Sequence, residues 1–116
     1  MSRLSKFLNM IIGTTLLFFS VTVEVTAADQ HELYMAKVES WLKGYEEAWE
    51  TLDADKATLL FTENAIYRED LYKDPYQGRE NIHKYWTTVT ADQKDVDFTF
   101  EILSVKGNTG IASLAF

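Results

Sequence analysis

The chain has 116 residues, of which 47% are hydrophobic and 25% are charged, and its formal net charge is -7 at neutral pH. The length suits one globular domain, and the negative charge disfavours nucleic acid and anionic membrane surfaces, which attract clustered Lys and Arg. Because the sequence contains no cysteine, disulfides, thiol catalysis and thiolate-bound metals are excluded.

The N-terminal segment has the pattern of a secretory signal peptide. Arg3 and Lys6 precede an apolar stretch over residues 10–23, and small residues follow at the expected cleavage positions. A membrane anchor is the alternative, but the apolar stretch is shorter than the about 20 residues that a bilayer requires. We therefore expect residues 1–27 to be removed, by cleavage after Ala27 or Ala28, and the mature protein to be secreted or periplasmic, without a membrane partner.

Two helices and a strand are predicted next. Apolar residues at helical spacing predict an amphipathic helix over residues 29–52, with its glutamates on the opposite side. Asp53 or Asp55 can cap a second, short helix over residues 56–61. After a break, the alternation over residues 65–69 predicts a strand.

The remainder alternates between polar turns and regular elements. Residues 70–78 contain the only proline and are predicted to be a loop, followed by a third helix over residues 79–89. The alternation over residues 96–102 predicts a half-buried strand, and its phase then shifts in a way that suggests a β-bulge or a face covered on both sides. A turn signal at residues 106–108 precedes a final strand over residues 109–116. Helices and strands segregate in this order, so the predicted class is α+β.

Short segments between Trp41 and Trp86 carry a family resemblance. They are YEEAW (45–49), DAD (53–55), LFTENA (60–65), YRED (67–70) and GRENI (78–82), followed by the aromatic pair Tyr85-Trp86. In this order they resemble the SnoaL-like branch of the nuclear transport factor 2 superfamily, and similar segments occur in bacterial ketosteroid isomerases. The resemblance implies a curved antiparallel sheet packed over three helices, a cystatin-like α+β roll with a cone-shaped pocket. Such domains usually continue with two more strands, so we expect the domain, residues 28–116, to be C-terminally incomplete.

The resemblance assigns catalytic roles to two side chains. Tyr45 falls where the ketosteroid isomerases have a tyrosine donor, and Glu69 falls where they have a carboxylate base. A buried hydroxyl can stabilise an enolate oxygen, and a carboxylate in an apolar pocket can accept a proton from carbon. The alternatives are that Tyr45 is a core residue and that Glu69 is solvated or pairs with Arg68. The oxyanion partner that the isomerases carry on a later strand has no counterpart here.

Aromatic side chains are the expected lining of a ligand pocket. Tyr67 alternates onto the same strand face as Glu69, and we expect Trp49 and Trp86 to lie closest to a ligand. His83 is a weaker catalytic candidate. The two histidines lie far apart in a chain without cysteine, so no metal site is expected. The sequence has no Gly-rich phosphate loop or dinucleotide fingerprint, so no other cofactor is expected either.

Three functions are consistent with these residues. The first is binding of a small apolar or amphipathic molecule in the cone. The second is proton-transfer catalysis of the isomerase, cyclase or dehydratase type, with Glu69 as base and Tyr45 as donor. The third is an interaction module without a ligand that dimerises through its sheet. The unpaired final strand, with its apolar residues Ile111, Leu114 and Phe116, also predicts a homo-oligomer or an aggregating domain.

Overall fold

The computed structural model describes residues 20 and 22–116, and it confirms the α+β class. Most of the predicted signal peptide, residues 1–27, lies outside the described residues. Within them, no helix is both long enough and apolar enough to cross a membrane. The elements are α2 (Ala27–Thr51), α3 (Ala54–Thr58), β1 (Ile66–Tyr67), β2 (Tyr76–Gln77), α4 (Arg79–Asp92), β3 (Thr99–Lys106) and β4 (Thr109–Ala115).

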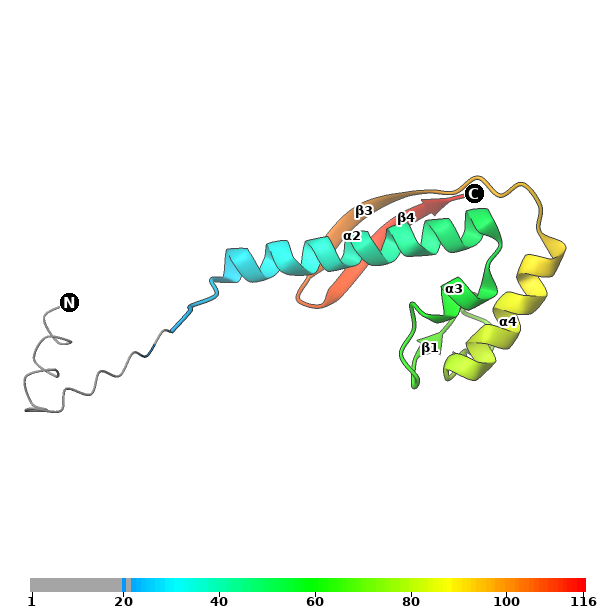
Figure 1. Cartoon of the computed structure of the whole chain (residues 1–116), viewed down its shortest axis with the longest axis horizontal. Coiled ribbons are helices and arrows are strands. Elements are labelled where there is room, and N and C mark those ends of the chain that lie inside the picture. The colour runs from blue at the N-terminus through cyan, green and yellow to red at the C-terminus, as the bar shows by residue number, and fades with distance from the viewer. Residues whose placement is uncertain (1–19, 21) are drawn as a thin grey trace, which may run out of the picture.

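The long helix α2 is the axis around which the other elements are arranged (Figure 1). Thr26 caps its N-terminus by accepting a hydrogen bond from the backbone N–H of Asp29 at 3.1 Å. Leu52 ends the helix in the left-handed conformation, at φ 53°. The prediction of residues 29–52 is thus confirmed to within two residues. The face of α2 that is buried in the protein carries Leu42, Tyr45, Ala48 and Trp49.

The short helix α3 begins at a side-chain cap. The Asp53 carboxylate accepts a hydrogen bond from the backbone N–H of Lys56 at 2.9 Å, so Asp53 rather than Asp55 is the cap. The helix ends at Thr58, earlier than predicted. Trp41 then donates its indole N–H to the Leu60 carbonyl at 2.8 Å, which ties the segment after α3 back to α2.

The strand predicted over residues 65–69 is shorter in the structure and has a partner that the sequence did not reveal. β1 covers only Ile66–Tyr67 and pairs antiparallel with β2, with Tyr67 opposite Tyr76. β2 lies inside the predicted loop 70–78, which is a correction to that prediction. Two residues are too few to show an alternating pattern, and Pro75 directly before them suggested a loop.

Helix α4 begins after Gly78, whose φ of 82° favours glycine, and runs to Asp92, three residues beyond the prediction. It buries Ile82 and Trp86 completely. Its N-terminal Arg79 donates hydrogen bonds to the Phe61 carbonyl, one of them from Nε at 2.8 Å. This contact joins α4 to the segment that follows α3.

Strands β3 and β4 form an antiparallel hairpin whose register changes between Ile102 and Ser104. The predicted shift in apolar phase therefore corresponds to a β-bulge at Leu103. The strand predicted over residues 96–102 corresponds to β3, which begins at residue 99 and extends to Lys106 because its pairing with β4 continues to the turn. The second, β4, agrees with the prediction to within one residue.

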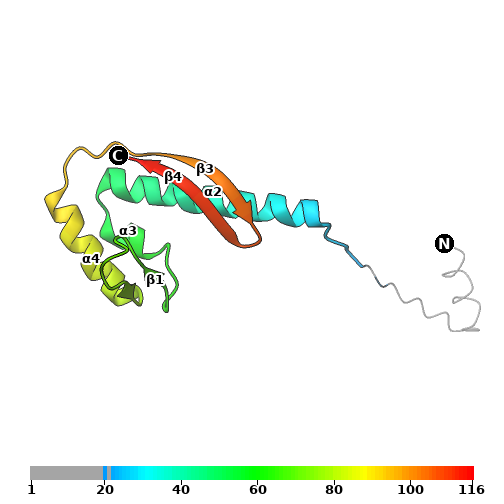
Figure 2. The same cartoon turned by 180° about the vertical axis from the view of Figure 1, so that it is seen from behind.

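The hairpin lies along one side of α2, while α3, α4 and β1 gather near the C-terminal end of α2; Figure 2 shows the same arrangement from behind. Among the described residues, the strands form two separate two-stranded sheets. A single aromatic core joins α2, α4 and the segment leading into β3, with Trp86 and Phe98 at most 1% exposed. The candidate site lies outside this core, beside α2 and between the ends of β1 and β4.

Candidate functional site

A cavity of about 380 Å³ opens where α2, the end of β1 and the end of β4 meet. We call it the α2–β1 cavity. Most of its lining is aromatic or aliphatic, whereas Tyr45, Tyr67, Arg68 and Glu69 bring polar groups to it. Its remaining lining residues are Trp41, Leu42, Leu114 and Phe116. The structure thus brings the two predicted catalytic residues, Tyr45 and Glu69, into the lining of one cavity, as their sequence positions suggested.

Hydrogen bonds connect these polar side chains into a continuous network. The Tyr45 and Tyr67 hydroxyl oxygens lie 2.8 Å apart. Tyr67 donates to Oε1 of Glu69 at 2.6 Å, and Tyr85, from α4, donates to Oε2 of the same carboxylate. We call these four residues the tyrosine–glutamate network. It joins α2, β1 and α4 around the carboxylate of Glu69.

The direction of the network follows from the donor content of its members. A tyrosine hydroxyl has one proton, and an ionised carboxylate can only accept. Because Tyr67 gives its proton to Glu69, the hydrogen bond between the tyrosines must be donated by Tyr45. All three tyrosine protons are therefore directed along the network toward Glu69.

Burial affects the ionisation of the two inner tyrosines. Desolvation raises the pKa of the Tyr45 hydroxyl above its usual 10.0, against the opposing effect of its hydrogen bond to Tyr67. Desolvation also raises the pKa of Tyr67, and the nearby Tyr45 and Glu69 add to the increase. Both hydroxyls consequently stay protonated at neutral pH, which is the state that the network requires.

The apolar wall of the cavity is held by aromatic stacking. Trp41 stacks on Tyr45 with ring centroids 5.1 Å apart, and its indole is fixed by the bond to Leu60. Phe116, which also lines the cavity, packs edge-on against Trp49 with ring centroids 5.4 Å apart. These aromatic contacts connect two rings of the cavity lining to the neighbouring aromatic side chains.

Trp49 and Trp86, predicted to lie closest to a ligand, are core residues in the structure. Their rings lie 4.3 Å apart, Trp86 is fully buried, and Trp49 is 5% exposed. Neither lines the α2–β1 cavity. Trp49 instead contacts the ring of Phe116, which does line the cavity.

The remaining candidates lie apart from the network. His83 is paired with Asp55 through Nε2 and Oδ1 at 2.7 Å, and this contact joins α4 to α3. Arg68 donates to the Lys73 carbonyl at 2.6 Å, and within the described residues it forms no ion pair with Glu69. The alternative in which Arg68 neutralises Glu69 is therefore not the one observed.

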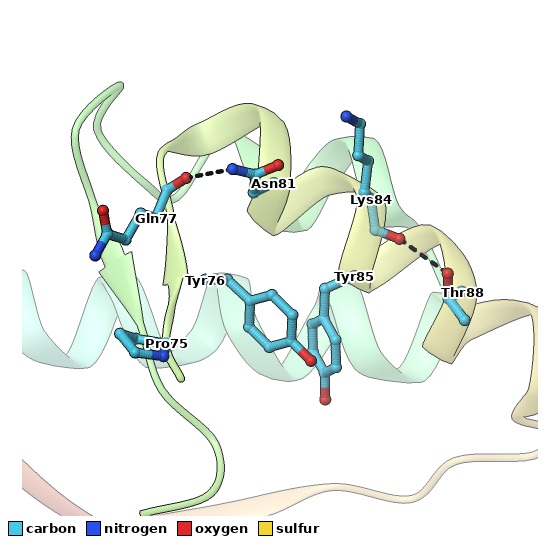
Figure 3. A pocket seen from close by; sticks show the side chains of 7 residues that line it. All are labelled: Pro75, Tyr76, Gln77, Asn81, Lys84, Tyr85 and Thr88. Carbon is cyan, nitrogen blue, oxygen red and sulfur yellow. Dashed lines mark hydrogen bonds between the residues drawn. The ribbon is translucent and has the colours of Figure 1, made fainter. Parts of the chain in front are cut away.

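Tyr85 is the functional candidate that sequence reasoning missed, because it was identified only as part of the aromatic pair Tyr85-Trp86 in the family resemblance. Its ring also borders a second, shallow hollow of about 560 Å³ on the outside of α4 and β2. Figure 3 shows this hollow, with the rings of Tyr76 and Tyr85 side by side; their centroids lie 4.4 Å apart. Their stacking fixes the Tyr85 ring, whose hydroxyl joins the network on the other side.

Comparison with known proteins yields one family. A model described as the SnoaL-like domain matches residues 42–116, which is more than half of the chain. The matched range contains all four members of the tyrosine–glutamate network. No curated protein matches the chain at a significant level.

Proposed function

The chain belongs to the SnoaL-like domain family of the nuclear transport factor 2 superfamily, and on this basis we propose that it binds a small amphipathic molecule in the α2–β1 cavity. Membership of the family indicates a ligand-binding or isomerase-type function. The observation that carries the proposal is the tyrosine–glutamate network at one wall of a cavity whose other walls are mostly apolar. Few polar groups placed among apolar walls are typical of small-molecule sites.

The size of the cavity agrees with this function. Its volume of about 380 Å³ falls at the lower end of the range of about 300–1,000 Å³ that is usual for small-molecule pockets. Leu114 is 41% exposed and Phe116 is 72% exposed at its rim. An apolar ligand would cover these side chains, and their removal from water would favour binding.

Binding of a fluorescent amphipath tests the proposal. N-phenyl-1-naphthylamine should fluoresce strongly with the protein, and Leu114→Trp, which fills the cavity, should weaken its binding at least tenfold. Leu103→Trp is the matched control, because Leu103 is 59% exposed on the hairpin and does not line the cavity. Absence of any fluorescence increase, or equal loss in both variants, would contradict the proposal.

Proton-transfer catalysis is the second candidate, and the position of Glu69 favours it. Glu69 is exposed and lines the same cavity as Tyr45, so one substrate could reach both groups. In this function Glu69 accepts a proton from a carbon next to a carbonyl, and Tyr45 donates a hydrogen bond to the resulting enolate oxygen. Tyr45 would have to turn its proton away from Tyr67 to do so.

Isomerisation of cyclohex-3-enone to the conjugated cyclohex-2-enone, followed by ultraviolet absorbance, tests the second candidate. Glu69→Gln should lower the rate by about 10²-fold or more, since it removes the base but keeps the shape of the side chain. Glu63→Gln, an exposed substitution outside the cavity, is the control. A rate that is unchanged by Glu69→Gln would remove Glu69 from the mechanism.

We also propose that the protein is exported, on the basis of the charged and apolar pattern of residues 1–27. Cleavage after Ala27 would remove the Thr26 cap, so the mature helix would begin without it. Mass spectrometry of the exported protein should find an N-terminus at Ala28 or Asp29. A membrane fraction that retains Met1 would contradict this.

A further inference from the structure

We propose that the ligand is a long-chain alcohol: its neutral hydroxyl binds the tyrosine–glutamate network as a hydrogen-bond donor, and its apolar tail lies in a neighbouring groove between α2 and β4. This inference rests on the proposed function and specifies the ligand class for the same cavity. It is carried by two observations, the direction of the hydrogen bonds and the continuity of the two hollows.

The first observation is that no member of the network has an uncommitted proton. Tyr45 donates to Tyr67, while Tyr67 and Tyr85 donate to the two oxygens of Glu69. Lone pairs are left on the Tyr45 oxygen and on the carboxylate of Glu69, and both residues line the cavity. A ligand group that donates a proton completes this network, whereas a carbonyl or ether oxygen finds no free donor among its four members.

The charge near the network favours a neutral donor over an ammonium group. Arg68 lines the same cavity as Glu69, so a cation would approach both a carboxylate and a guanidinium. The carboxylate already accepts hydrogen bonds from two tyrosines, which stabilise its charge without a counter-ion. A hydroxyl can donate to Tyr45 or Glu69 without repulsion from Arg68.

The second observation is a groove of about 320 Å³ that extends the cavity along α2. We call it the α2–β4 groove. All of its lining residues are apolar or glycine: Val38, Trp41, Leu42, Gly110, Ala112 and Leu114. Trp41, Leu42 and Leu114 line the α2–β1 cavity as well, so the two hollows adjoin along a shared wall.

Close packing at Gly110 limits the groove at its far end. A Cβ built on Gly110 would lie 2.7 Å from Cγ1 of Val38, so the hairpin approaches α2 closely there. The groove and the α2–β1 cavity together therefore run from an apolar end at Val38 to the polar side chains around Tyr45. This polarity fits a ligand with one polar head and one unbranched apolar tail.

Competition for bound N-phenyl-1-naphthylamine tests the head group on the wild-type protein. Decan-1-ol should displace the probe at about tenfold lower concentration than decan-2-one or 1-methoxydecane, which have similar tails but donate no proton. In Tyr67→Phe, Tyr45 loses its acceptor and its proton becomes available to the ligand. The concentration of decan-2-one that displaces the probe should therefore fall toward that of decan-1-ol in this variant.

The tail is tested by filling the groove. Ala112→Leu should weaken binding of decan-1-ol about tenfold while changing hexan-1-ol by less than twofold, because only the longer tail reaches Ala112. Ser113→Leu is the matched control: it adds a large side chain at the neighbouring position of β4, which alternation directs to the opposite face of the hairpin. It should leave both affinities unchanged.

The outcomes separate this inference from the proposed function. If decan-2-one displaces the probe from the wild-type protein as well as decan-1-ol does, the inference of a hydrogen-bond-donating head group is wrong. The proposal that the cavity binds an amphipathic molecule is then unaffected. Tighter binding of decylammonium than of decan-1-ol would overturn the neutral head, and equal effects of Ala112→Leu and Ser113→Leu would overturn the tail position. Failure of all these amphipaths and of the fluorescent probe would contradict the proposed function itself.

Discussion

At the scale of single residues, the decisive feature is that Tyr67 and Tyr85 donate to one carboxylate, that of Glu69, while Tyr45 donates to Tyr67. Three elements of the fold contribute to this contact, and each hydroxyl has a partner. A buried hydroxyl without a partner would cost about 1–3 kcal/mol. The network therefore stabilises the position of β1 against α2 and α4, in addition to lining the cavity.

Alkaline pH should destabilise the protein through Tyr45 and Tyr67. The folded state raises the pKa of both hydroxyls, whereas the unfolded chain titrates near the ordinary 10.0. Their contribution to stability is thus complete below pH 10 and declines as the pH rises further, by up to about 1.4 kcal/mol per pH unit for each tyrosine. Tyr67→Phe should make the decline less steep.

Urea unfolding between pH 8 and pH 11 measures this difference. Tyr72→Phe is the control, because Tyr72 is 98% exposed and should leave the slope unchanged. A wild-type free energy of unfolding that stays constant to pH 11 would show that these hydroxyls ionise as easily in the folded state as in the unfolded chain.

At the scale of secondary structure, Asp53 determines where α3 begins. Its carboxylate accepts the hydrogen bond from the backbone N–H of Lys56, which would otherwise lack a helical partner. Asp53→Ala should lower the free energy of unfolding by about 1 kcal/mol, and Asp53→Asn by much less, because Asn also caps. Urea denaturation of the two variants compares these values, and equal losses would assign the effect to charge instead of capping.

Gly110 determines how closely the hairpin approaches α2. Gly110→Ala places a methyl group 2.7 Å from Val38, whose branched side chain has little freedom to move, and should cost about 1–3 kcal/mol. The double variant Val38→Ala/Gly110→Ala should recover part of this loss. Thermal unfolding of the single and double variants gives the coupling energy, and a coupling near zero would contradict the close contact.

At the scale of the whole molecule, the hairpin leaves apolar side chains exposed on the side away from α2. Leu103 and Ile111 are 59% and 58% exposed, and within the described residues β3 and β4 pair only with each other. Unpaired strand edges beside apolar side chains favour association with another chain. The net charge of -7 opposes association, but physiological salt screens it.

We predict that the protein self-associates through this hairpin at micromolar concentration. Ile111→Glu should shift sedimentation equilibrium toward the monomer, since it places a charge in the contact. Leu71→Glu is the control, because Leu71 is 83% exposed on the loop between β1 and β2. A wild-type protein that sediments as a monomer would refute the association.

The sequence by itself determined the elements whose signals are local. The α2 helix and the β3–β4 turn were predicted close to their observed positions, because periodicity and turn chemistry act over a few residues. The Asp53 cap and the bulge were each one of two alternatives that the local sequence left open. The family resemblance also selected Tyr45 and Glu69, which line the same cavity in the structure.

Only the tertiary structure decided which side chains meet. Tyr85 and Glu69 are 16 positions apart, and nothing in the spacing on α4 indicates that the Tyr85 hydroxyl reaches the carboxylate. Trp49 and Trp86 have the same residue type as Trp41, yet packing places the first two in the core and the third at the cavity wall. The physical reason is that burial and hydrogen-bond partners depend on how α2, α4 and the hairpin pack together, which no local pattern in the sequence specifies.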